Sequence, residues 1–160
     1  MSKKAVLGAI GSAVLGAAAG ASVVGKRMDE ERTRQKELAD KHLALFVMMC
    51  DWMRQSQEGR SLGGYLKEAG YRRVAVYGLS YAGERVLDEL FNHGIEVPYA
   101  IDRQRDSTYF AVKVCRPEDE LREVDAVIVT AITFYDEIRE QLESMLSCPI
   151  LSLEDIIREM

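Results

Sequence analysis

The sequence predicts an α/β fold, in which a long N-terminal helix precedes a parallel five-stranded sheet of order 3-2-1-4-5. Two observations lead to this prediction. After residue 73, short apolar runs alternate with helical stretches, and this alternation is typical of a parallel sheet with right-handed crossovers. The apolar run Val74–Tyr77 is followed by a glycine turn and then by helical periodicity, an order that ligand-binding α/β units share.

Composition limits the size and the class of the protein. The 160 residues, 48% of them hydrophobic, suffice for one compact core and an appendage. The formal net charge of −5 disfavours nucleic acid as a partner, because phosphate binding requires a clustered excess of Lys and Arg. Cys50, Cys115 and Cys148 are widely spaced, without a C-x-x-C pair or a nearby His at ligand spacing. We therefore expect reduced thiols, a cytosolic compartment and no metal site.

The chain is expected to have three parts. These are an Ala/Gly-rich hydrophobic anchor over residues 1–25, an amphipathic helix or linker over 26–60, and a Rossmann-like domain over 61–160. Residues 5–25 carry no charge and are long enough to span a membrane. A transmembrane anchor, a packed Ala/Gly helix in a soluble assembly and a cleaved signal peptide are the three interpretations. We expect the anchor, and the Lys and Arg residues after it place the soluble domain in the cytoplasm.

Both N-terminal segments have a face suited to self-contact. In the first, small residues recur at every fourth position: Gly8, Ser12, Gly16 and Gly20. In the second, a heptad seam has alternating spacings of four and three: Leu38, His42, Leu45, Met49 and Trp52. We expect a homo-oligomer, although the seam is also suited to docking on the globular domain.

The other elements follow from apolar runs and helical spacing. A short helix over 61–70, with Ser61 as its N-cap, leads to the first strand. Later strands are expected at 95–101, 109–114, 126–131 and 149–153, and helices at 81–91, 117–123, 134–146 and 154–160. The runs 74–77 and 126–130 are the most continuously apolar, so we expect them at the centre of the sheet.

The loop after the first strand is the main candidate for ligand binding. Gly78-x-Ser80-x-x-Gly83 lies where the dinucleotide fingerprint G-x-G-x-x-G would lie, with Ser80 in place of the middle glycine. Ser80 either crowds the ligand or offers it a hydroxyl. Asp102 ends the second strand, 24 residues after Gly78, and is placed to accept a hydrogen bond from a ribose hydroxyl. The predicted cofactor-binding residues are Gly78, Ser80, Tyr81, Ala82, Gly83, Asp102, Arg103 and Thr130.

Two interpretations of this loop remain open. In the first, backbone N–H groups bind a phosphate, Arg103 and Arg105 attract it, and the ligand is NAD or a nucleotide-sugar rather than NADP. In the second, Gly78 and Gly83 serve only a tight turn and close helix packing, and Asp102 is a loop carboxylate.

Five stretches follow one another along the domain: VAVYGLSYAG, VPYAIDR, PEDEL, VDAVIVTAI and ILSLEDII. Together they resemble the small Rossmann-like module of bacterial surface-polysaccharide biosynthesis proteins, over residues 62–157. The resemblance implies nucleotide or nucleotide-sugar binding, with a glycosyltransferase or other glycan-assembly protein as partner. The N-terminal segment is similar to short membrane anchors of small bacterial envelope proteins.

Catalysis has little support in the sequence. Ser80 lacks the spacing of a nucleophile elbow, and no His follows His93 to act as its base. We therefore predict no catalytic residue, and a membrane-tethered, non-catalytic or regulatory module that binds a nucleotide or nucleotide-sugar in glycan biosynthesis. One alternative is an NAD(P)-dependent nucleotide-sugar-modifying enzyme or subunit. The other is a structural or oligomerisation scaffold without a ligand.

Overall fold

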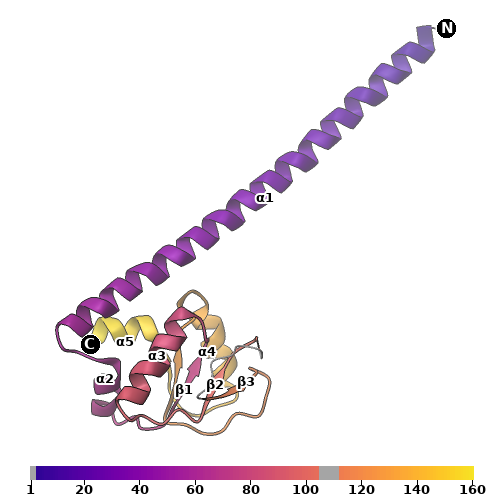
Figure 1. Ribbon diagram of the computed structural model, residues 1–160. Coiled ribbons are helices and arrows are strands. Elements are labelled where there is room, and N and C mark those ends of the chain that lie inside the picture. Colours follow the sequence, from indigo (N-terminus) through magenta and orange to yellow (C-terminus); the bar gives the residue numbers. More distant parts are fainter. Residues whose placement is uncertain (1–2, 105–111) are drawn as a thin grey trace. The chain divides into compact units, whose positions relative to one another are not determined.

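The computed structural model describes residues 3–104 and 112–160, with side chains from residue 26 onward (Figure 1). The chain divides into two units, Met1–Leu43 and Ala44–Met160. Helix α1 (Lys3–Gln57) begins in the first unit and ends in the second. The predicted long N-terminal helix is therefore confirmed.

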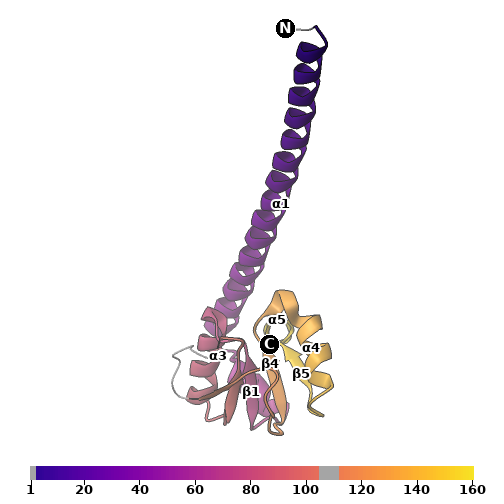
Figure 2. The same cartoon turned by 90° about the vertical axis from the view of Figure 1, so that its right-hand side faces the viewer.

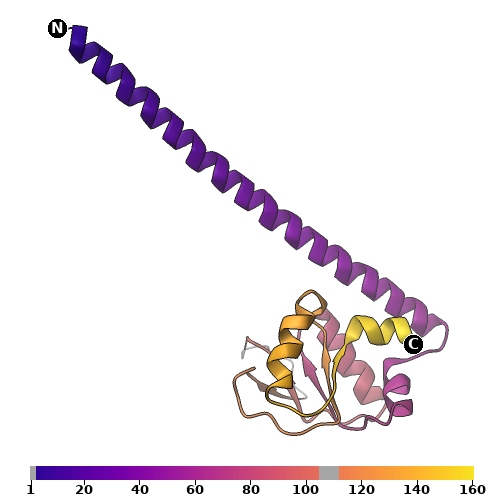
Figure 3. The same ribbon diagram turned by 180° about the vertical axis from the view of Figure 1, so that it is seen from behind.

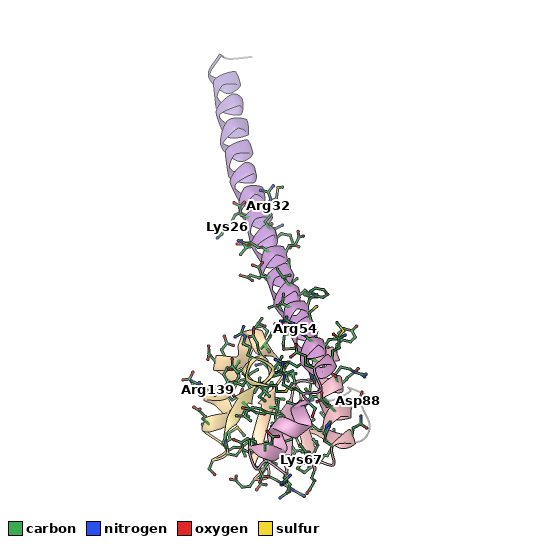
Figure 4. The ribbon with its side chains drawn as sticks, turned by 90° about the vertical axis from the view of Figure 1, so that its left-hand side faces the viewer. Lys26, Arg32, Arg54, Lys67, Asp88 and Arg139 are labelled. Atoms are coloured by element: carbon green, nitrogen blue, oxygen red, sulfur yellow. The ribbon has the colours of Figure 1, made fainter. Side chains whose placement is uncertain are left out.

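The described side chains of the first unit belong to a solvated stretch of α1. All side chains from residue 26 to residue 43 are exposed. Charges of both signs are interspersed along this stretch, and Lys26 and Arg32 stand away from the helix in Figure 4. Such a pattern is typical of a helix in water.

One part of the sequence prediction is wrong. Within the part of the chain that the structure describes, no helix has the length and apolar character needed to cross a lipid bilayer. The predicted transmembrane helix, and with it the predicted membrane attachment through residues 5–25, is therefore corrected. The physical reason lies in the composition, because Ala and Gly predominate in this stretch and contribute little to the free energy of insertion. The strongly apolar residues are few: Val6, Leu7, Ile10, Val14, Leu15, Val23 and Val24.

The second unit contains the predicted sheet. All strand pairs are parallel, and the order is β3-β2-β1-β4-β5, as predicted. The strands are β1 (Val74–Tyr77), β2 (Tyr99–Ile101), β3 (Lys113–Cys115), β4 (Ala126–Val129) and β5 (Ile150–Ser152). The α/β fold class is thereby confirmed.

Strands β1 and β4 lie at the centre of the sheet. Val74 pairs with Ala126 and Tyr77 with Val129, and every residue of both strands is buried. Continuous apolar runs are what a parallel strand needs when helices cover both of its faces.

Asp125, directly before β4, holds the start of β1. Its Oδ2 accepts the backbone N–H groups of Arg72 and Arg73, each at 2.7 Å. The bonds from Arg73 and Arg72 hold the pKa of the Asp125 carboxyl below its usual value.

Helices cover both faces of the sheet (Figures 2 and 3). After α1 they are α2 (Leu62–Glu68), α3 (Tyr81–Asn92), the 3-10 helix η1 (Ile132–Phe134), α4 (Tyr135–Glu143) and α5 (Leu153–Glu159). Figure 2 shows α3 and α4 on opposite sides of the strands. In Figure 3, α4 lies in front of the strands.

Alternate residues of β1 separate two apolar cores. Val74 and Val76 pack with residues of α2, α3 and α5, whereas Tyr77 packs in the core that includes residues of α4. The core on the α3 side also receives Met48 and Trp52 from the end of α1, which are 2% and 6% exposed. The C-terminal part of α1 is therefore an integral part of the second unit.

The predicted heptad seam of α1 is only partly buried. Trp52 is buried, Leu45 and Met49 are half-buried, and Leu38 and His42 are exposed. The two exposed members lie in the first unit, whereas the other three lie in the second. Among the described residues, the part of the seam that lies in the second unit therefore packs on the domain.

A carboxylate bridges three helices at this docking site. Glu89 of α3 accepts a hydrogen bond from Trp52 Nε1 at 2.9 Å and another from the backbone N–H of Leu62 at the start of α2. Both donors lie at least partly out of water, so the loss of their common acceptor would leave them unsatisfied.

We expect Glu89→Ala to lower the free energy of unfolding by about 2 kcal/mol, because two donors lose their partner. Trp52 is the only tryptophan of the chain, so its fluorescence reports on the docking and should shift to the red. Urea denaturation followed at Trp52 measures both effects. The matched control is Asp88→Ala, which breaks an exposed ion pair with Arg85 and should cost less than about 0.5 kcal/mol. Equal effects of the two variants would contradict the bridging role.

Several predicted boundaries differ from the structure. Residues 117–123 do not form the predicted helix: a turn and a bend over 117–119 are followed by irregular chain, and the Asp119 carboxylate accepts the backbone N–H of Arg116 at 2.8 Å. Strand β2 begins only at Tyr99, after an isolated bridge between Arg73 and Glu96. Residues 109–111 of the predicted third strand lie outside the described residues.

Candidate functional site

A cavity of about 390 Å³ lies at the carboxyl edge of the sheet. Tyr77, the last residue of β1, pairs with Ile101 of β2 and with Val129 of β4, so the segments after these three strands begin side by side. The cavity is lined by residues from all three segments and from η1 and α4. It lies where the strand order reverses, between β1 and β4.

Hydrogen bonds with the ends of β2 and β4 hold the loop after β1 in place. Gly78 has φ of +93°, and a Cβ there would lie 2.8 Å from Thr130 Oγ1. Its N–H donates to the Ile101 carbonyl at 2.8 Å, while the Thr130 hydroxyl donates to the Gly78 carbonyl at 2.8 Å. Glycine is thus required both by the backbone conformation and by the space.

Gly83 brings α3 against this loop. A Cβ at Gly83 would lie 2.0 Å from the Gly78 carbonyl oxygen. This residue therefore serves the packing of the first helical turn on the glycine loop, which is the role of the third glycine of the dinucleotide fingerprint.

Asp102 ties the loop after β1 to the loop after β2. Its Oδ2 accepts the backbone N–H of Leu79 and its Oδ1 accepts that of Gln104, each at 2.8 Å. A carboxylate has about four acceptor positions. Asp102 therefore braces the loop and keeps capacity for a ligand hydroxyl.

The first turn of α3 faces the same region. Ser80 is its N-cap, with an extended backbone and no side-chain capping bond, and the Ser80 side chain is exposed at the cavity. The first backbone N–H groups of any helix lack partners within the helix, and together with the helix dipole they favour an anion.

A comparison with protein-family models now adds to this geometry. The model described as C2185-like, N-terminal, matches residues 70–149, which is half of the 160 residues. The chain belongs to the C2185-like family. No curated protein and no solved structure matches it.

In this C2185-like protein, all residues that line the cavity lie within the matched region. That region begins just before β1 and ends just before β5, so it contains the switch point of the sheet. The part of α1 that packs on the domain lies outside it.

Four of the predicted site residues line the cavity of the C2185-like protein: Gly78, Ser80, Asp102 and Arg103. The other four do not line it. Gly83 and Ala82 are buried in the first turn of α3, Thr130 is buried beneath the loop, and Tyr81 is 83% exposed. Arg105 lies outside the described residues.

Seven lining residues were not predicted from the sequence: Tyr77, Leu79, Gln104, Ala131, Phe134, Glu137 and Ile138. Three of them have a signal in the sequence: Phe134, Glu137 and Ile138 are three and four residues apart and so share one helix face. Tyr77 was assigned only to the core of the sheet.

The cavity has an apolar wall and a charged mouth. Tyr77, Leu79 and Ile138 are 4%, 8% and 3% exposed, and they form the wall. Arg103 and Glu137 are exposed at the mouth. With Asp102, the lining carries two carboxylates and one guanidinium.

A second cavity, of about 370 Å³, lies between the end of α1 and α3. It is lined by residues that include Trp52, Asp88, Glu89 and His93. Figure 4 labels Asp88 on this side of the domain and Arg139 of α4. In the described residues, no group of three or more His, Cys, Asp or Glu is arranged to hold a metal ion.

Proposed function

We propose that this C2185-like protein is a non-catalytic module that binds a nucleotide or nucleotide-sugar in the cavity at the carboxyl edge of its sheet. The position of the cavity at the strand-order reversal is the main support, because ligands of open α/β sheets bind at such points. Its volume is within the range of small-molecule sites.

The distribution of charge suggests how such a ligand would lie. Asp102 and Glu137 make the cavity unfavourable for a polyanion, whereas the apolar wall suits a neutral ring. The first turn of α3, with the Ser80 hydroxyl, suits a phosphate. We therefore place the nucleoside in the cavity and its phosphates at the start of α3.

The enzyme alternative has one feature in its favour. Short-chain sugar-modifying enzymes use a Tyr-x-x-x-Lys pair, and Tyr109 and Lys113 have this spacing. Lys113, however, begins β3 at the edge of the sheet and does not line the cavity, and Tyr109 lies outside the described residues. We therefore favour binding over catalysis. The role in glycan assembly stays a prediction from the resemblance. Self-association stays a prediction from the two helix faces, and a cytoplasmic location stays a prediction from the Lys and Arg residues after residue 25.

Titration calorimetry of the full chain with NAD, NADP, UDP-sugars and CDP-sugars tests the proposal. We expect NAD or a UDP-sugar to bind with a dissociation constant on the order of 10 to 1,000 μM. NADP should bind more weakly than NAD, because Asp102 would repel its 2′-phosphate. If no member of the panel binds below about 5 mM, an affinity near 3 kcal/mol, the proposal fails and the scaffold alternative replaces it.

A further inference from the structure

The hydroxyl of Tyr77 is buried without a hydrogen-bond partner among the described residues. Other tyrosines of the same core are satisfied: the Tyr99 hydroxyl donates to the Arg122 carbonyl at 2.6 Å, and the Tyr135 hydroxyl donates to the Ile150 carbonyl at 2.7 Å. Folded proteins rarely leave such a group unpaired, because its desolvation is not compensated. We therefore expect the Tyr77 hydroxyl to have a hydrogen-bond partner that the described fold does not contain.

The position of Tyr77 indicates that this partner belongs to a ligand. The residue is only 4% exposed, yet it lines the cavity at the carboxyl edge. Its side chain packs on the α4 side of the sheet, in the same cluster as Ile138, and Ile138 also lines the cavity. Tyr77 thus lines a wall that is otherwise apolar, and its unpaired hydroxyl is buried on the same side of the sheet.

We propose that Tyr77 recognises the ligand by a hydrogen bond between its hydroxyl and the edge of a heteroaromatic ring, which makes the bound group a nucleobase. This inference rests on the proposed function and adds that the protein recognises the nucleobase of the ligand. A phenol both donates and accepts, so it suits the mixed donors and acceptors of a base edge. A flat ring also suits the apolar wall, whereas a phosphate there would be repelled by the carboxylates of Asp102 and Glu137.

The hydroxyl is buried in the ligand-free chain, so contact with a base requires side chains to move on binding. Such side-chain changes are common at binding sites, even where the backbone stays fixed. Phe134, which lines the mouth and is 46% exposed, provides a second ring surface for a base.

Tyr77→Phe in the full chain tests this inference, with Tyr99→Phe as the matched control. The probes are AMP, UMP and CMP, with ribose 5-phosphate as a ligand that lacks a base. We expect Tyr77→Phe to weaken the best-bound nucleotide by about tenfold, to leave ribose 5-phosphate unchanged, and not to lower the urea midpoint. Tyr99→Phe should do the opposite, because it removes a satisfied hydroxyl outside the cavity: a lower midpoint and unchanged affinity.

The outcomes separate the two proposals. If the unmodified chain binds a nucleotide and Tyr77→Phe binds it equally well, Tyr77 does not read the base, while the proposed function stands. Equal losses for the nucleotide and for ribose 5-phosphate would also overturn the inference, because the hydroxyl would then act on the sugar or phosphate. If the unmodified chain binds none of these probes, the inference fails, whereas the proposed function is decided by the panel of NAD, NADP, UDP-sugars and CDP-sugars.

Discussion

Gly83→Ala is expected to destabilise the protein, although alanine is the better helix former. A Cβ at this position would lie 2.0 Å from the Gly78 carbonyl oxygen, a backbone atom fixed by the Thr130 hydroxyl. Overpacking of this kind costs about 3 kcal/mol, and the gain in helix propensity is about 1 kcal/mol. We therefore expect the free energy of unfolding to fall by about 2 kcal/mol, which is the difference between those two terms.

Urea denaturation followed by circular dichroism measures this change. Ser80→Ala, three residues earlier, serves as the control, because Ser80 is exposed and makes no capping bond. The control should shift the midpoint little. An unchanged or higher midpoint for Gly83→Ala would contradict the close packing of α3 on the glycine loop.

Asp102→Ala is expected to weaken both the loop and the ligand site. The backbone N–H groups of Leu79 and Gln104 both lose their acceptor, and Leu79 is buried. The free energy of unfolding should fall by about 2 kcal/mol. If a ribose hydroxyl also donates to this carboxylate, nucleotide affinity should fall by roughly 10- to 100-fold.

Asp102→Asn separates these effects, because an amide keeps one acceptor oxygen but loses the charge. It should destabilise less than Asp102→Ala and should reduce the preference for NAD over NADP. Calorimetry with both cofactors gives that preference. If Asp102→Ala lowers stability but leaves nucleotide affinity unchanged, Asp102 is a loop brace alone.

The sheet could be predicted from the sequence because its central strands are short, fully apolar runs. Val74–Tyr77 has the predicted bounds, and the chain before and after it has clear turn and helix signals. The edges were harder to place. The edge strand β3 pairs only with β2, so fewer contacts fix its limits, and residues 117–123 after it form a turn and irregular chain instead of a helix.

The site could be predicted only in part. Gly78 and Asp102 have a recognisable spacing, and the structure brings them together across the Leu79 N–H. The sequence did not show that Asp102 also forms hydrogen bonds within the protein, where it accepts one backbone N–H from each of the two loops. Likewise, Tyr77 looks like any core tyrosine until its neighbours are known, and the lack of a partner is a property of packing alone.

The N-terminal segment was misjudged for a different reason. A stretch without charges has the length of a membrane span, but length and apolar character are separate requirements. Residues 5–25 are long enough, but their high content of Ala and Gly makes them too weakly apolar.

Chemical-shift mapping of the full chain by NMR, during titration with the nucleotide that binds best, tests the central claim most directly. The cavity account predicts the largest shifts at the backbone amides of Leu79, Ser80 and Gln104, and at the side chain of Tyr77. Shifts confined to Trp52 Nε1 and the residues around the second cavity would contradict it.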